Sequence, residues 1–153
     1  MRIALQEAQK AFAKDEIPIG AVIVHEGQIV GKGYNLVETL QDPTAHAELL
    51  AINAAANVLA SWRLDETILY TTLEPCPMCA GAILLARIPL VVYAAKDPRL
   101  GACGSVINVL EGRYFDIGAQ VIGDVMGTES RELLQRFFVE LRRKKNDNSN
   151  PAR

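Results

Sequence analysis

The sequence predicts an α/β fold, a three-layer α/β/α sandwich with a central mixed sheet of five strands. Segments whose apolar residues recur at helical spacing alternate along the chain with short apolar runs rich in β-formers. The 153 residues fit one domain, and neither an internal repeat nor a long linker divides them. Half of the residues are hydrophobic and 22% are charged, which is typical of a globular protein rather than a disordered one.

The N-terminal part predicts a helix followed by a hairpin. Residues 3–14 carry apolar side chains at helical spacing, and Ile17-Pro18-Ile19-Gly20 breaks that pattern. Residues 21–24 and 29–30 read as two short strands around His25-Glu26-Gly27. We therefore expect these two strands to be antiparallel.

The middle of the chain predicts a helix, a buried strand and a second helix. Asp42-Pro43-Thr44 has the composition of a helix start, and an alanine- and leucine-rich helix is expected over 45–59. Residues 67–73 are β-rich and mostly apolar, which suits a buried strand that ends at Pro75. The next helix should run from about 77 to 86.

The C-terminal part predicts two strands and a long amphipathic helix. Residues 90–95 form another apolar strand, 106–110 are expected as a short helix, and 119–122 as the last strand. Residues 129–145 combine an apolar stripe with a charged face, which is typical of a helix. Strands joined through helices should be parallel. The domain is expected to span residues 1–145, followed by a frayed polar tail over 146–153.

Composition narrows the class of protein. The formal net charge of −2 is no overall signature of a nucleic-acid binder, so RNA binding would depend on a local patch. No apolar run approaches the roughly 18 residues of a membrane span, and no signal-peptide pattern follows Met1. We expect a cytoplasmic protein without a membrane partner. Three cysteines are an odd number, which argues against a disulfide framework.

One histidine and two cysteines predict a metal site. His46 lies near an expected helix start, and Cys76 and Cys79 occur in Pro75-Cys76-Pro77-Met78-Cys79. Imidazole and two thiolates suit zinc, and three protein ligands leave a fourth tetrahedral position open, as in catalytic sites. Residues three apart at a helix start share a face, and the helix N-terminus favours thiolates. We expect one zinc ion per chain.

Glu48 is the expected proton carrier beside that metal. Zinc lowers the pKa of bound water from about 15.7 to about 7, and a nearby carboxylate can move the protons. Residues two apart in an ideal helix do not face each other. His46 and Glu48 therefore converge only if the metal lies beyond the helix end or across its first turn. His-x-Glu with Pro-Cys-x-x-Cys is the signature of zinc deaminases, in which the glutamate is not a ligand.

At these residues the sequence resembles the cytidine deaminase superfamily and, more closely, the bacterial tRNA-specific adenosine deaminases. The resemblance runs from Met1 to about Lys145. It is carried by the stretches Ile17-Pro18-Ile19-Gly20-Ala21-Val22, Asp42-Pro43-Thr44-Ala45-His46-Ala47-Glu48, Ser61-Trp62-Arg63-Leu64, Thr72-Leu73-Glu74-Pro75-Cys76-Pro77-Met78-Cys79-Ala80-Gly81-Ala82 and Ala86-Arg87-Ile88-Pro89. A cytidine deaminase-like fold and a homodimer are implied by it.

The resemblance also implies substrate-binding roles. Asn35 matches the asparagine that contacts the target nucleoside, the Ala47 backbone matches the position that reads the base edge, and Asp97 matches a residue close to the anticodon loop backbone. Two of these have plainer interpretations. Asn35 suits a turn at a strand end, and Asp97 suits a turn before Pro98.

Two C-terminal features bear on an RNA substrate. Asp116-Ile117-Gly118 stands where many family members carry an Asn-His-Arg stretch that helps hold flipped-out anticodon bases, so this chain should hold RNA less tightly or through other residues. Residues 136–145 carry five cations and one acid. Arg142, Arg143, Lys144 and Lys145 are therefore candidate RNA contacts, although a basic helix end also suits the helix dipole.

The leading hypothesis is zinc-dependent hydrolytic deamination of adenosine to inosine at the wobble position of a tRNA anticodon, with an arginine tRNA expected from the resemblance. The partner would be a tRNA anticodon stem-loop. The nearest alternative is deamination of a free base or nucleotide, such as guanine or a cytosine derivative, by the same site. A non-catalytic zinc module is disfavoured by the open fourth position. A redox Cys-x-x-Cys protein would not need the His-x-Glu partner.

Overall fold

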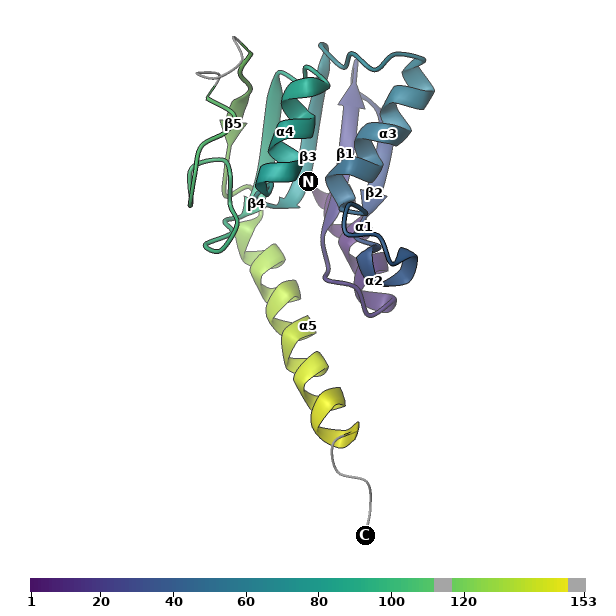
Figure 1. Cartoon of the computed structure of the whole chain (residues 1–153), viewed down its shortest axis with the longest axis vertical. Helices are drawn as coiled ribbons and strands as arrows, with labels where there is room; N and C mark the ends of the chain where they lie inside the picture. The colour runs from purple at the N-terminus through teal and green to yellow at the C-terminus, as the bar shows by residue number, and fades with distance from the viewer. Residues whose placement is uncertain (112–116, 149–153) are drawn as a thin grey trace.

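The computed structural model describes residues 1–111 and 117–148. Helices and strands alternate along them (Figure 1). The elements are α1 (Arg2–Ala13), β1 (Gly20–His25), β2 (Gln28–Tyr34), α2 (Val37–Leu40), α3 (Ala47–Leu59), β3 (Thr67–Leu73), α4 (Pro77–Leu85), β4 (Leu90–Ala95), β5 (Gln120–Ile122) and α5 (Gly127–Asn148).

The five strands form one mixed sheet in the order β2-β1-β3-β4-β5. β1 is antiparallel to both β2 and β3, whereas β3, β4 and β5 are mutually parallel. The strands β2, β3 and β4 consequently run in the same direction, so their carboxyl ends lie along one edge of the sheet. Helices cover both faces, and the predicted α/β/α sandwich is confirmed.

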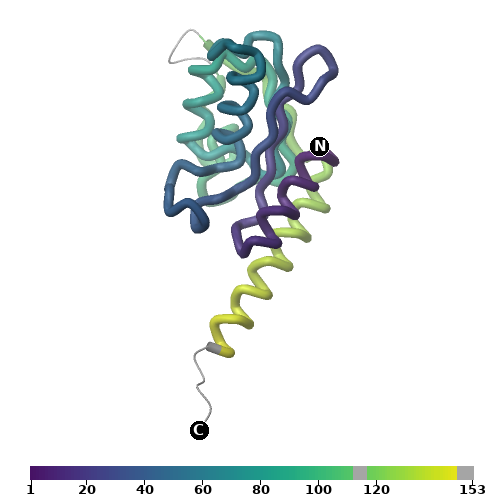
Figure 2. Tube along the Cα trace, turned by 90° about the vertical axis from the view of Figure 1, so that its right-hand side faces the viewer, coloured from purple at the N-terminus to yellow at the C-terminus, as the bar shows by residue number. Residues whose placement is uncertain are grey.

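α3 and α4 lie on one face of the sheet, and α1 and α5 on the other (Figures 1 and 2). The main apolar core fills the space between the sheet and the α3/α4 layer. On the opposite face the rings of Phe12 and Phe137 meet edge to face at 5.7 Å and join α1 to α5. α5 then continues well past the sheet (Figure 1).

Small residues bring α3 very close to β2. Ala47, Ala51 and Ala55 are fully buried and four apart, so they form one stripe of the helix. Gly31 and Gly33 are two apart on β2 and therefore point to the same face. A Cβ added at Gly33 would lie 2.2 Å from the Ala47 carbonyl oxygen. Only glycine allows this approach, which fixes the N-terminal end of α3 against the sheet.

The hairpin is tighter than its sequence suggested. His25 pairs with Gln28, so the loop consists of Glu26 and Gly27 alone. Both have positive φ, 49° and 74°, as a type I′ turn requires. The two strands therefore run longer than predicted.

Three predicted elements need correction. α3 begins at Ala47 rather than at residue 45, and His46 is its N-cap. Residues 106–110 are not helical, because the amides of Val106 and Ile107 both donate to the Gly101 carbonyl oxygen and fold the segment into a compact loop. α5 continues to Asn148, so the first three residues of the predicted tail are helical. The last five lie outside the described residues.

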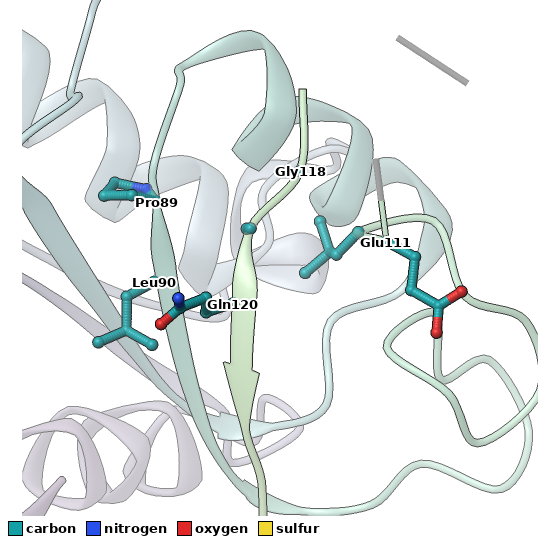
Figure 3. Close-up of a pocket in the computed structure, with 7 residues that line it drawn as sticks. Pro89, Leu90, Glu111, Gly118 and Gln120 are labelled. Carbon is teal, nitrogen blue, oxygen red and sulfur yellow. The ribbon is translucent and has the colours of Figure 1, made fainter. Parts of the chain in front are cut away.

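Two residues of the segment that departs from the family pattern, Ile117 and Gly118, directly precede the region of the edge strand β5. Asp116 lies outside the described residues, and Ile117 packs against the apolar core. Gly118 lines a depression of about 540 Å³ together with Pro89, Leu90 and Gln120 (Figure 3). No histidine or cysteine lines this depression, so the predicted metal cluster belongs to a different part of the molecule.

Candidate active site

A cavity of about 700 Å³ opens at the carboxyl ends of the parallel strands. Asn35 follows β2, Cys76 follows β3 and Asp97 follows β4, and all three line the cavity together with His46 and Glu48. The edge where parallel strands end is the common ligand site of open α/β sheets. With Lys145 of α5, the structure brings six of the sequence-predicted site residues around one cavity. Ala47 and Cys79 are fully buried beside it.

The side chains of His46, Cys76 and Cys79 form a compact cluster. The His46 Nδ1 atom lies 3.7 Å from the Cys76 sulfur and 3.5 Å from the Cys79 sulfur, and all three ligand atoms lie within 4.8 Å of one another. Bond lengths of about 2.05 Å for Zn–N and 2.3 Å for Zn–S imply about 3.6 Å between nitrogen and sulfur in a tetrahedral site. The cluster therefore fits a zinc ion.

Two helix N-termini converge on this cluster. His46 is the N-cap of α3 and Cys76 is the N-cap of α4, both with extended backbone, and Pro77 occupies the first position of α4. Helix N-termini stabilise negative charge, which suits thiolates. Hydrogen bonds from Cys79 and His46 lower the pKa of Cys76 to about 4. The hydrogen bond with Cys76, together with burial, raises the pKa of Cys79. Binding of a metal ion requires both sulfurs as thiolates.

Glu48 faces the cluster because His46 is not part of the helix. The extended backbone of His46 turns its ring across the first turn of α3, where Glu48 is the second residue. This removes the conflict that the two-residue spacing posed for an ideal helix. Glu48 is 4% exposed, and burial raises the pKa of its carboxyl group. A carboxyl group with a raised pKa can both accept and return a proton near neutral pH.

Asn35 is held in place by a carboxylate that sequence reasoning missed. Its Nδ2 atom donates to Glu16 Oε2 at 3.3 Å, and both side chains are buried. Glu16 also accepts hydrogen bonds from the backbone amides of Glu38 and Thr39, at 3.2 and 2.6 Å. It thereby caps α2, which the sequence did not predict. An acidic residue directly before the apolar Ile17-Pro18-Ile19 segment was the available signal for its burial.

Asp97 lies in a loop that a second buried carboxylate organises. Asp97 Oδ1 accepts the amides of Arg99 and Leu100, so the residue is a turn former as well as a cavity-lining one. The side chain of Glu74 accepts the amides of Asp97, Cys103 and Ser105, each at 3.0 Å. Burial acts to raise the pKa of Glu74, but hydrogen bonds from the Ser105 side chain and from these three amides outweigh it and lower the pKa below its ordinary value.

α5 supplies an apolar wall of the cavity, and the four predicted RNA-binding cations on this helix lie in different surroundings. Leu134, Phe137, Phe138 and Leu141 line the cavity, and Lys145 lines it one turn further along the helix. Lys144 instead pairs with Asp15, at the end of α1. Arg142 and Arg143 are exposed, and Arg143 lies in a shallow groove on the outer face of α5. Of the four cations, Lys145 is the one that lines the cavity.

Comparison with known proteins agrees with this site. Residues 1–95 match the family model of the cytidine and deoxycytidylate deaminase zinc-binding region. The chain is 48% identical over 145 residues to a tRNA-specific adenosine deaminase of Bacillus subtilis. The match covers 95% of this chain and 90% of that relative. A structure from work on A-to-I editing by tRNA:A34 deaminases at the wobble position of transfer RNA superposes with a TM-score of 0.84 and 41% identity, covering 87% and 96% of the two chains.

A second solved structure, the guanine deaminase of Bacillus subtilis, is 49% identical to this chain. Its TM-score is lower, 0.59, and the match covers 62% of this chain and 61% of the other. The likeness to the tRNA:A34 deaminase structure therefore extends over more of the fold than the likeness to this guanine deaminase.

The α/β/α fold, the matched zinc-binding region and the His-Cys-Cys cluster define the class of the protein, a zinc-dependent hydrolytic deaminase with one zinc ion per chain. Within that class the chain belongs to the family of tRNA-specific adenosine deaminases. Among the helices of residues 1–111 and 117–148, none is long and apolar enough to cross a membrane.

Proposed function

We propose that this protein hydrolyses adenosine to inosine at the wobble position of a tRNA anticodon, with an arginine tRNA as the expected substrate and the cytoplasm as the site of action. The observation that carries the proposal is that His46, Glu48 and Cys76 line one cavity together with apolar residues of α5. A cavity of about 700 Å³ has room for a nucleotide turned out of an RNA loop.

His46, Cys76 and Cys79 would hold the zinc ion, which when bound makes water a competent nucleophile at neutral pH. Glu48 takes a proton from the attacking water and delivers it to the ring nitrogen next to the amino-bearing carbon. It then takes the remaining proton from the added hydroxyl group and passes it to the leaving amino group. One water is consumed, ammonia leaves, and a carbonyl oxygen replaces the amino group. Burial of Glu48 excludes bulk water from this proton transfer.

Three groups would orient the nucleoside. The buried Asn35 amide, fixed by Glu16, contacts the target nucleoside at the cavity wall. The Ala47 backbone lies at the N-terminus of α3, where amides lack partners within the helix, so it can bind a polar base edge. Asp97 lines the same cavity and would lie near the loop backbone of the RNA.

The RNA around the target nucleotide would rest on α5. Phe138 is 39% exposed at the cavity, and an aromatic ring there can stack on a neighbouring base. Lys145 lines the same cavity and can contact a phosphate. Arg142, Arg143 and Lys144 do not line the cavity and would contact the tRNA farther from the active site.

The active unit would be a homodimer formed through α4. This helix carries no charged residue, and its outward stripe consists of Met78, Gly81, Ala82 and Leu85. Leu85 is 73% exposed, and a Cβ added at Gly81 would meet open space. A helix that is apolar on all sides is normally covered on all sides. A second copy of the chain is the partner that the family resemblance implies.

One assay separates this proposal from its nearest alternative. The purified protein is incubated with an arginine tRNA anticodon stem-loop and, separately, with free adenosine, guanine and cytidine, and each product is measured by mass spectrometry. We expect inosine in the stem-loop and no turnover of the free compounds. Conversion of guanine with an unchanged stem-loop would instead support the alternative that the likeness to guanine deaminase suggests.

A further inference from the structure

We infer that Glu74 is a positioning residue for the substrate, which holds the loop of residues 97–105 in the conformation that presents Asp97 to the RNA. The inference rests on the proposed function for the identity of the substrate. Glu74 is 1% exposed and lies two residues before the cluster residue Cys76. Its carboxylate therefore connects the metal-binding turn directly to the loop of residues 97–105.

Both oxygens of the Glu74 carboxylate accept backbone amides of the loop. Oε1 accepts the amides of Cys103 and Ser105, and Oε2 accepts the amide of Asp97. Backbone bonds complete the attachment, because the Glu74 amide donates to Ala95 and the Ala102 amide donates to Pro75. An ionised side chain thus replaces the regular secondary structure that this loop lacks.

Gly101 shows how closely the loop approaches this carboxylate. A Cβ at Gly101 would lie 2.5 Å from Glu74 Oε2 and 2.5 Å from the Asp97 carbonyl oxygen. Neither neighbour can move without disturbing a hydrogen bond at Asp97. Glycine is therefore required at this position by the contact between loop and carboxylate, and the contact has no part in the zinc cluster.

The loop held in this way forms much of the cavity rim. Lys96, Asp97, Arg99 and Leu100 all line the cavity. If the loop moves, the groups that face the RNA move while His46, Glu48 and the two cysteines stay attached to α3 and α4. Loss of Glu74 should accordingly weaken substrate binding and leave the chemical step intact.

Replacing Glu74 by Gln tests this sharply because glutamine has one acceptor oxygen. That oxygen is best placed at the Oε1 position, where two amides bind, which leaves an NH₂ group facing the Asp97 amide. We expect Glu74→Gln to raise KM for the stem-loop roughly tenfold to a hundredfold, the effect of losing one hydrogen bond to a charged group. The kcat and the zinc content should stay near those of the unmodified protein.

Amide hydrogen exchange measured by NMR reports how well the amides of this loop are protected, and it needs no substrate. In Glu74→Gln the Asp97 amide should exchange faster, and the α4 amides should not. Glu7→Gln is the matched control, since Glu7 is 3% exposed but bonds to Lys10 within α1. Gly101→Ala is a second variant that should produce the same two changes if Glu74→Gln does not fold.

Unchanged exchange at Asp97 in these variants, or a loss of kcat and zinc with an unaltered KM, would overturn the inference. So would an equal rise of KM in Glu7→Gln. If the unmodified protein does not deaminate the stem-loop, the proposed function fails, while the exchange measurement still decides whether Glu74 holds the loop.

Discussion

Replacing Gly33 by Ala should damage the active site from a position outside it. The added Cβ would lie 2.2 Å from the Ala47 carbonyl oxygen and 2.7 Å from the Ala51 nitrogen, so α3 must move away from β2. The moving end of α3 carries His46 and Glu48. Overpacking of this kind costs about 1–3 kcal/mol. For a chain of this length the melting temperature should fall by about 2–12 °C.

Gly20→Ala is the matched control for this prediction. Its Cβ would lie 2.1 Å from the Ala4 carbonyl oxygen, so it displaces α1 on the opposite face of the sheet by a similar clash. We expect comparable losses of melting temperature in the two variants by calorimetry. Zinc content and deamination, measured well below either melting temperature, should fall in Gly33→Ala alone. Full zinc and full activity in Gly33→Ala would refute the idea that this glycine contact fixes the metal-binding end of α3.

Three further predictions concern the chemistry and the RNA contacts. Replacing His46, Cys76 or Cys79 by Ala should remove zinc because each supplies one of three ligand atoms. If elemental analysis finds the full zinc content in Cys79→Ala, Cys79 is not a ligand and the assignment is wrong. Glu48→Gln should keep zinc but lower kcat by about 10²–10⁴, the usual contribution of general acid–base catalysis, whereas loss of metal would make Glu48 a ligand. Lys145→Ala should reduce the slope of log affinity for the stem-loop against log salt by about 0.7–0.9, one phosphate contact, with Arg143→Ala as the control on the outer face of α5. An equal slope in the unmodified protein, Lys145→Ala and Arg143→Ala would mean that the basic end of α5 faces solvent and makes no phosphate contact.

Local patterns were enough to predict most of the fold. The stretches 67–73 and 90–95 match β3 and β4 residue for residue, since apolar β-formers bounded by turn residues leave little choice. The predicted helix at 106–110 was wrong because its amides bind Gly101 and its neighbours rather than residues one turn back. α2 was missed because the carboxylate that caps it, Glu16, lies more than twenty residues away in the chain.

The sequence was enough to predict the metal ligands of the candidate site, but not the buried carboxylates that hold its loops in place. His46, Cys76 and Cys79 carry a chemistry that their spacing reveals, and the structure brings them together. Glu16 and Glu74 carry no motif of their own, and their importance becomes visible only when burial and backbone partners are known. The geometry of His46 and Glu48 likewise depended on a helix start two residues later than the composition indicated.

The most direct test of the account is position-resolved analysis of a tRNA that carries adenosine at the wobble position. The zinc-loaded protein should convert that one adenosine to inosine and leave the other adenosines unchanged, and Glu48→Gln should carry out the conversion at least about a hundredfold more slowly. An unreduced rate in Glu48→Gln, or a wobble adenosine that stays intact while free guanine or cytidine is deaminated, would contradict the proposal that this cavity acts on RNA through Glu48.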